Sequence, residues 1–230
     1  PKTGSSFLIK MGFHKIWVDK DYNAGALGGF TYGVTTEEMA GGYAALANDG
    51  VYRKATCIRL IVDASNKTVV NETNRDSKVY DKSASRMMTQ MLREVVLSGT
   101  GTSANVENAV VAGKTGTTNA SKDVWFCGYS KYYTTTVWAG YDYPKEMSGV
   151  NSRVNAIFKD FMTAVHTNLP VTDFSTVTQQ TTQPETTAAV QEETQSLPQE
   201  TTVITLPAAP IYLLILLNLF NLICFSTFNI

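Results

Sequence analysis

Residues 109–141, AVVAGKTGTTNASKDVWFCGYSKYYTTTVWAGY, decide the fold class of this chain. They hold three runs rich in β-branched and aromatic residues, Ala109–Thr117, Val124–Lys131 and Tyr133–Tyr141. Turn-forming residues separate these runs, which is typical of strands joined by hairpins. Consecutive strands joined by short turns pair antiparallel. The stretch therefore predicts an antiparallel sheet with three adjacent strands.

Helices are predicted on both sides of this stretch. The clearest is Lys82–Leu97, where methionine, leucine and valine recur at every fourth position and form an apolar stripe. A capping box of Thr35 and Glu38 opens another helix, which runs to about Asn48. Further expected elements are helices over Ser5–Met11 and Asn151–His166, a glycine-rich loop over Asp19–Gly33, and a hairpin of Cys57–Asp63 with Thr68–Asn71. The order predicts an α+β fold, an antiparallel sheet packed with helices.

Composition divides the 230 residues into three parts. Residues 1–169 are predicted to be globular, and residues 1–160 carry all 19 lysines and arginines against 15 of the 20 acids. Residues 170–207 contain 11 threonines, 6 glutamines and one aromatic residue, Phe174, which predicts a disordered or extended linker. Residues 208–230 form an uncharged apolar tail. The tail is interpreted either as a membrane-spanning helix or as non-native sequence.

The chain offers few groups that bind metals or cofactors. Cys57, Cys127 and Cys224 are far apart, and His14 and His166 have no neighbouring ligands. We therefore expect no zinc site and no disulfide framework, with the cysteines buried as small apolar side chains and the histidines on the surface. The formal net charge of −1 gives no indication of nucleic-acid binding.

The tetrapeptide Lys114-Thr115-Gly116-Thr117, at the end of the first predicted strand, is the candidate site. Side chains alternate along a strand, so Thr115 and Thr117 face one way while Lys114 and Gly116 face the other. Two hydroxyls suit a substrate carboxylate, the lysine adds positive charge, and the glycine lets neighbouring groups approach the backbone. An exposed strand edge also offers N–H groups to a peptide or an oxyanion. The alternative interpretation is a solvated strand end with a surface lysine.

Other motifs are weaker. A second Lys-Thr-Gly at residues 2–4 leads into a predicted helix, not out of a strand. Residues 99–104 match the dinucleotide pattern G-x-G-x-x-A but follow a helix and open none, which argues against a dinucleotide site. Ser103-Ala104-Asn105 matches S-x-N by letter only. Trp125, Trp138, Tyr129 and Tyr141 are expected to pack in the core or on the sheet, and Asp123 to shape the hairpin turn.

Several blocks resemble, in order, the transpeptidase domain of class A penicillin-binding proteins. They are LSGTGT (97–102), VAGKTGTTN (111–119), DVWFCGY (123–129) and VWAGYD (137–142), with ALGGFTYGVTTEEMA (26–40) upstream. The resemblance covers most of residues 20–165. It implies the penicillin-binding transpeptidase or β-lactamase-like fold, incomplete here at its N-terminus.

The resemblance also implies an activity, that of a serine-type D-Ala-D-Ala transpeptidase or carboxypeptidase. Such enzymes cross-link peptidoglycan stem peptides by serine acyl transfer, and β-lactams acylate the same serine. The family motifs are S-x-x-K, S-x-N and K-T-G. This chain has the third, as Lys114-Thr115-Gly116, and no S-x-x-K. The first two are expected upstream of the region similar to Pro1–Gly12.

The same resemblance assigns roles to the tetrapeptide. Lys114 and Thr117 are expected to be catalytic: Lys114 hydrogen-bonds the S-x-N serine, and the Thr117 N–H forms one arm of the oxyanion hole. Thr115, Gly116 and Thr117 are expected to bind substrate, with the two hydroxyls holding the terminal carboxylate of a D-Ala-D-Ala stem peptide or of a β-lactam. No metal and no cofactor are implied.

Partners and location follow from the resemblance as well. The expected partners are stem peptides, glycan strands derived from lipid II, and β-lactams, at the extracytoplasmic face of the cell membrane. The anchor would be an N-terminal helix outside this chain, in a bifunctional peptidoglycan synthase that also carries a glycosyltransferase. Two alternatives stay open: a non-catalytic penicillin-sensing or wall-associated domain of the same fold, and an inactive fragment.

Overall fold

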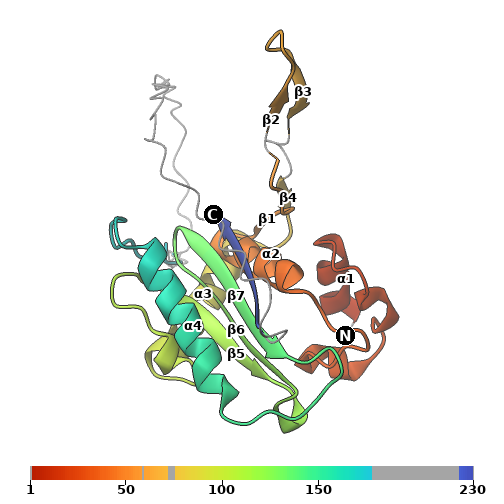
Figure 1. The fold of residues 1–230 in the computed structure, drawn as a ribbon. Coiled ribbons are helices and arrows are strands. Elements are labelled where there is room, and N and C mark those ends of the chain that lie inside the picture. Colours follow the sequence, from red (N-terminus) through yellow and green to blue (C-terminus); the bar gives the residue numbers. More distant parts are fainter. Residues whose placement is uncertain (1, 59, 72–75, 178–222, 230) are drawn as a thin grey trace, which may run out of the picture. The chain divides into compact units, whose positions relative to one another are not determined.

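The computed structural model describes residues 2–58, 60–71, 76–177 and 223–229 (Figure 1). These residues belong to one compact unit that spans residues 1–177 and 220–230. Four α-helices are assigned in this part of the chain: α1 (Lys2–Lys10), α2 (Thr36–Ala47), α3 (Lys82–Leu97) and α4 (Val150–Val165). The predicted helix Lys82–Leu97 is confirmed residue for residue, and the other three are confirmed with shifted ends.

The central sheet has the order β5-β6-β7-β8, and every neighbouring pair is antiparallel. The strands are β5 (Ala112–Thr117), β6 (Asp123–Tyr129), β7 (Tyr133–Gly140) and β8 (Ile223–Asn229). The first three confirm the predicted hairpin-linked strands, although β5 begins three residues later than expected. Asp123 shapes the β5–β6 turn as predicted, because its carbonyl accepts the Thr118 N–H at 3.0 Å.

Two smaller ribbons lie between α2 and α3 in the sequence. Strand β1 (Val51–Arg53) pairs with β4 (Asp76–Lys78), and β2 (Leu60–Val62) pairs with β3 (Thr68–Asn71). The β2–β3 ribbon is the predicted hairpin, whereas β1 and β4 were not expected. The predicted glycine-rich loop contains one 3₁₀ turn, η2 (Asn23–Leu27), and another, η1 (Ile16–Val18), lies just before it. Short 3₁₀ turns also occur at η3 (Thr102–Ala104) and η4 (Asn119–Ser121).

Helix α4 covers one face of the central sheet (Figure 1). The Phe126 and Phe158 rings lie 4.5 Å apart between centroids, and both side chains are fully buried. Gly128 has no room for a side chain, since a Cβ there would lie 2.7 Å from Phe158 Cζ. This layer supplies most of the apolar core: Val96, Ala104, Val106, Ala109, Val111, Val124, Phe126, Val137, Ala139, Met147, Val154, Phe158 and Met162.

The opposite face packs against α2 and α3. Tyr129 is three positions from Phe126 and therefore points to the other side of the sheet. Its ring lies 6.4 Å from the Tyr43 ring of α2, and its hydroxyl lies 2.8 Å from Thr89 Oγ1 of α3. The capping box of α2 is confirmed, with Thr35 Oγ1 accepting the Glu38 N–H and the Glu38 carboxylate accepting the Thr35 N–H.

The aromatic residues of the sheet behave largely as expected. Tyr129 is buried, and Trp125 and Trp138 are register partners on β6 and β7 with ring centroids 6.1 Å apart. Trp138 Nε1 donates to the Asp123 carboxylate at 3.1 Å. Tyr141 is 39% exposed and lies just after β7.

The compact unit continues past residue 169, where the globular part was expected to end. Residues 171–177 belong to the compact unit. The Phe174 ring packs edge-on to Tyr129 at 5.4 Å, and Asp173 accepts two hydrogen bonds from Arg93 at 2.9 Å. The ring contact with β6 and the ion pair with α3 together attach this segment to the unit. The rest of the expected linker, residues 178–207, lies outside the described residues.

The apolar tail is described only over residues 223–229, where the chain forms strand β8 instead of the suggested spanning helix. Its backbone pairs with β7 from Tyr133 to Ala139. Residues 208–222 of the expected tail lie outside the described residues. None of the helices in the described part has the length and hydropathy of a membrane span.

The expected surface position of His166 is wrong. This side chain is 2% exposed, with Nδ1 2.7 Å from the Met162 carbonyl and Nε2 2.8 Å from Ser130 Oγ. It ties the end of α4 to the β6–β7 turn, which explains why a polar ring is tolerated in the core. His14 is on the surface and Cys127 is buried, as expected, whereas Cys57 is exposed.

Candidate active site

The tetrapeptide Lys114–Thr117 lies at the end of β5, and β5 is an edge strand of the central sheet. Its register with β6 sets Thr115 opposite Phe126 and Thr117 opposite Val124. These two threonines therefore share the α4 face. Lys114 and Gly116 share the other face, so the predicted alternation is confirmed.

The pairing with β6 determines which backbone groups face the open edge. Thr118 donates its N–H to the Asp123 carbonyl, so this pair is hydrogen-bonded. Hydrogen-bonded and non-hydrogen-bonded pairs alternate in an antiparallel ladder. The Thr115–Phe126 and Thr117–Val124 pairs are consequently non-hydrogen-bonded pairs. The N–H and carbonyl groups of Thr115 and Thr117 thus point away from β6, toward the edge.

The Lys114 ammonium folds back along this edge. Its Nζ donates to the Thr115 carbonyl at 2.9 Å and lies 3.4 Å from Thr115 Oγ1. The lysine is exposed, and in the described part its charge has no carboxylate within salt-bridge distance. A free cation is thereby held next to outward-facing N–H groups, an arrangement that suits an anion.

Two contacts were not expected from the sequence. Thr115 Oγ1 lies 2.8 Å from Thr100 Oγ1, which comes from the turn after α3. Thr117 Oγ1 donates to Asn151 Oδ1 at 3.2 Å, at the start of α4. Thr100 lies between two glycines just after a clearly predicted helix, and this pattern indicates a turn. The pattern does not indicate that Thr100 contacts Thr115. Nothing in the sequence pointed to Asn151.

Glycines bring the backbone close to its neighbours at this end of the sheet. A Cβ on Gly113 would lie 2.8 Å from Phe126 Cζ, and one on Gly116 would lie 3.3 Å from Trp125 Cβ. A side chain at residue 113 would therefore displace β5 from β6. At residue 116 a side chain would press on Trp125.

The β6 residue opposite Lys114 is Cys127, which is fully buried. Burial raises the pKa of the Cys127 thiol to about 12, because a thiolate is poorly solvated there. This thiol stays protonated near neutral pH and is no candidate nucleophile. Among the described residues, no group of three His, Cys, Asp or Glu side chains is arranged to hold a metal ion.

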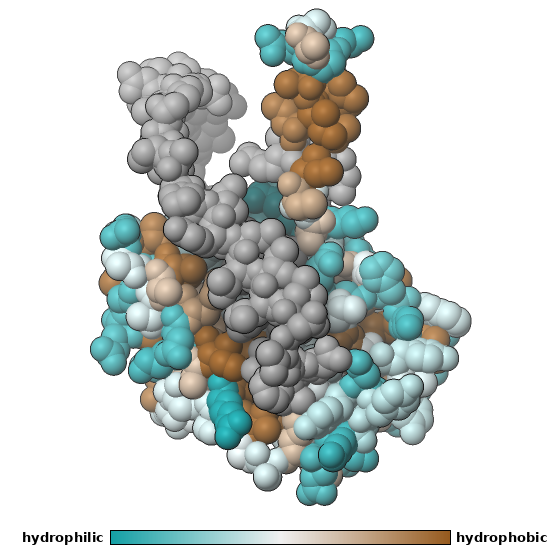
Figure 2. Space-filling view, in the orientation of Figure 1, coloured by the Kyte–Doolittle hydropathy of each residue, from teal (hydrophilic) through white to brown (hydrophobic). Residues whose placement is uncertain are grey.

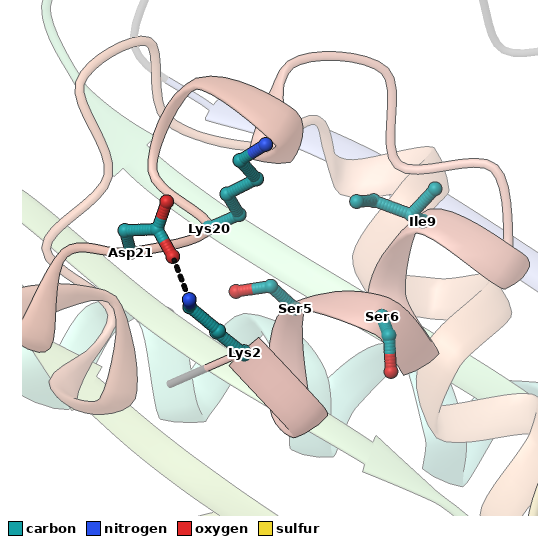
Figure 3. Close-up of a pocket in the computed structure, with 6 residues that line it drawn as sticks. All are labelled: Lys2, Ser5, Ser6, Ile9, Lys20 and Asp21. Carbon is teal, nitrogen blue, oxygen red and sulfur yellow. Dashed lines mark ion pairs between the residues drawn. The ribbon is translucent and has the colours of Figure 1, made fainter.

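Two cavities of the described part lie away from the tetrapeptide. One, of about 250 Å³, is lined by Lys2, Ser5, Ser6, Ile9, Lys20 and Asp21, and a Lys2–Asp21 ion pair of 3.4 Å crosses it (Figure 3). The other, of about 390 Å³, is apolar and lies between α1, α2 and α3. The second Lys-Thr-Gly lies inside α1, whose residues line the first of these cavities.

The Ser103-Ala104-Asn105 match has a structural role. Ser103 Oγ accepts from Asn155 Nδ2 at 2.8 Å, which links η3 to α4. Ala104 is fully buried against the α4 layer. The residues after α3 therefore attach the α3–β5 connection to the core.

The model of the penicillin binding protein transpeptidase domain matches residues 10–163 of this chain. The chain therefore belongs to the family of penicillin-binding protein transpeptidase domains. The resemblance seen in the sequence is confirmed, and with it the mixed helix and antiparallel-sheet fold.

Individual relatives agree with this assignment. The chain is 33% identical over 172 residues to penicillin-binding protein 1A of Clostridium acetobutylicum, which covers 74% of this chain and 21% of that protein. It is 38% identical over 180 residues to penicillin-binding protein 1A of Aquifex aeolicus, which covers 75% and 24%. The chain thus spans about a fifth to a quarter of the length of these curated relatives.

The solved structure of the penicillin-binding protein PonA1 from Mycobacterium tuberculosis is similar as well. It has a TM-score of 0.54 and 25% identity, and the match covers 64% of this chain and 42% of that chain. A second PonA1 structure, in complex with penicillin V, has the same TM-score and 23% identity over 65% and 43% of the two chains. At that identity the second match speaks for the fold alone.

Proposed function

We propose that this chain supplies the K-T-G strand, β5, that forms one side of the acyl-transfer site of a D,D-transpeptidase. The substrates would be peptidoglycan stem peptides ending in D-Ala-D-Ala, and β-lactams would occupy the same site. One observation carries the proposal: the outward N–H groups of Thr115 and Thr117 lie beside the Lys114 ammonium on an edge strand. Family membership and the similarity to penicillin-binding proteins 1A support it.

Each residue of the tetrapeptide has a chemical task in this proposal. The Thr117 N–H stabilises the oxyanion that forms when the scissile carbonyl is attacked, a role in which a single donor is worth about 10²–10³ in rate. The Thr115 and Thr117 hydroxyls donate to the substrate carboxylate, for which Thr117 turns from Asn151. Lys114 hydrogen-bonds the serine of an S-x-N motif and adds positive charge. Gly116 leaves the face beside Trp125 open.

The nucleophile would come from an S-x-x-K motif, which residues 1–230 do not contain. We therefore propose that the 230-residue chain alone forms no acyl-enzyme. The protein that carries it would be a bifunctional peptidoglycan synthase held at the extracytoplasmic face of the membrane. It would also have D-Ala-D-Ala carboxypeptidase activity whenever water replaces the acceptor strand.

The test is covalent labelling by penicillin. The polypeptide that extends this chain upstream through S-x-x-K and S-x-N is incubated with benzylpenicillin, and its intact mass is measured. We expect the addition of one penicilloyl group. A folded extended polypeptide that gains no adduct would contradict transpeptidase function and favour a non-catalytic domain. Stoichiometric labelling of the 230-residue chain would contradict the assignment of the nucleophile.

Lys114→Ala in the extended polypeptide tests the site itself. Loss of a charge-assisted hydrogen bond predicts acylation slower by about 10- to 100-fold. Lys122→Ala is the matched control, because Lys122 is an exposed lysine in the β5–β6 turn of the same hairpin. Equal rates for Lys114→Ala and Lys122→Ala would remove Lys114 from the site.

A further inference from the structure

The turn between α3 and β5 is fixed tightly to the helix that precedes it. The Gly99 N–H donates to the Glu94 carbonyl at 3.1 Å, and the Gly101 N–H donates to the Val95 carbonyl at 2.9 Å. A Cβ on Gly99 would lie 2.9 Å from Val95 Cα, and one on Gly101 would lie 3.2 Å from Phe126 Cε2. Glycine on both sides of Thr100 thus lets the turn lie directly on α3 and the sheet core.

This turn sets the Thr100 hydroxyl against the candidate site. Its Oγ1 lies 2.8 Å from Thr115 Oγ1, across fifteen positions of sequence. Thr100 is exposed and Thr115 is half-buried. The contact therefore joins a surface hydroxyl to a half-buried hydroxyl on β5.

The partners of Thr115 Oγ1 restrict where its proton points. A hydroxyl has one proton to donate and two lone pairs to accept with. The Lys114 ammonium, 3.4 Å away, can only donate, so it is directed at one lone pair. If Thr100 donates to the second lone pair, the Thr115 proton is left for a third partner. A carboxylate can only accept hydrogen bonds, so a carboxylate bound to Thr115 needs the Thr115 proton. Its presence therefore favours the arrangement in which Thr100 donates to Thr115.

We infer that Thr100 is a positioning residue for carboxylate recognition, a role that rests on the proposed function. With an anionic substrate bound, a chain of hydrogen bonds runs from Thr100 through Thr115 to the carboxylate. Each bond in such a chain polarises the next and strengthens it. Thr100 itself stays away from the reacting atoms, so its contribution is to binding of the negative charge.

The test compares acylation by benzylpenicillin and by its methyl ester, which lacks the negative charge. The extended polypeptide with its own serine is used, as wild type, Thr100→Val and Thr100→Ser. We expect Thr100→Val to slow acylation by benzylpenicillin about three- to tenfold, the range for one hydrogen bond. The ester is expected to react at the wild-type rate. Thr100→Ser, which keeps the hydroxyl, restores most of the benzylpenicillin rate.

Thr102→Val is the matched control, since Thr102 is an exposed threonine in the same connection, at the start of η3. It should leave both rates unchanged. An equal loss for both compounds with Thr100→Val, or no loss at all, would overturn the inference while the proposed function stands. Absence of labelling in the wild type overturns the proposed function and the role of Thr100 with it.

Discussion

The central sheet and the β2–β3 ribbon are built from the same kind of sequence but differ in what covers them. In the sheet, Phe126 and Val137 are fully buried beneath α4. In the ribbon, four aliphatic side chains are between 42% and 63% exposed, namely Leu60, Ile61, Val62 and Val69. Figure 2 shows this ribbon as a brown surface beneath a hydrophilic tip.

The difference shows that strand formation and stabilisation by burial are separate events. The ribbon has strands of three and four residues, a size at which two strands alone are marginally stable. Its tip is ordered locally, because Asp63 Oδ1 accepts hydrogen bonds from Ser65 and Lys67. The sheet gains its stability from helices on both faces. Four substitutions test this contrast.

The largest effect is expected in the α4 layer. Phe158→Ala removes a fully buried ring that contacts Phe126 and leaves a cavity. The free energy of unfolding should fall by about 3–5 kcal/mol. Urea denaturation measures this, with Phe158→Leu as a milder control. A fall below about 1 kcal/mol would mean that the layer is not the main source of stability.

A smaller effect is expected on the opposite face of the sheet. Tyr129→Phe keeps the ring and removes the hydroxyl that lies 2.8 Å from Thr89 Oγ1. The expected loss is about 1 kcal/mol, the net value of one buried hydrogen bond. Tyr143→Phe serves as the control, because Tyr143 is 91% exposed. If both variants unfold at the same urea concentration, the Tyr129–Thr89 hydrogen bond contributes nothing to stability.

Asp49 lies in the turn before β1 and forms an ion pair with Arg86 of α3. Hydrogen bonds from Arg86 hold the pKa of Asp49 below its ordinary value. Because the pKa of Asp49 is lower in the folded state, ionised Asp49 stabilises the fold at pH values above its unfolded-state pKa of about 3.9. This contribution to stability is lost as the pH falls through the folded-state pKa.

Asp49→Asn should therefore lower Tm modestly at pH 7 and flatten its dependence on pH below about pH 4. Asparagine tolerates the positive φ of 52° at this position, so the backbone is unchanged. Thermal melts at a series of pH values provide the measurement. Wild-type and variant curves that stay parallel down to pH 2 would contradict the assignment.

The smallest effect is expected in the ribbon. Val69→Ser replaces a side chain that is already 63% exposed, so the free energy of unfolding should change by less than about 0.5 kcal/mol. The same urea denaturation applies. A loss above about 1.5 kcal/mol would show that the ribbon is packed as the central sheet is.

Much of the fold could be predicted because the signals are local. The apolar repeat and the Ser98-Gly99 stop define α3, and reciprocal hydrogen bonds between near neighbours define the start of α2. Period-two alternation placed Thr115 and Thr117 on one face of β5. Strands β1 and β4 were missed because each has three residues, and their pairing joins segments about 25 positions apart (Tyr52 with Ser77).

By itself, the sequence determined helices α1 to α4, the hairpin-linked strands β5 to β7 and the alternation along the tetrapeptide, because helix period, strand period and turn chemistry act over a few residues. The ordered motifs of the sequence also indicated the family to which the chain belongs. Only the tertiary structure decided that β5 is an edge strand, that Thr100 reaches Thr115, and that Phe174 belongs to the packed unit. These features depend on which distant segments bury each other's apolar surface, and no local pattern encodes that choice.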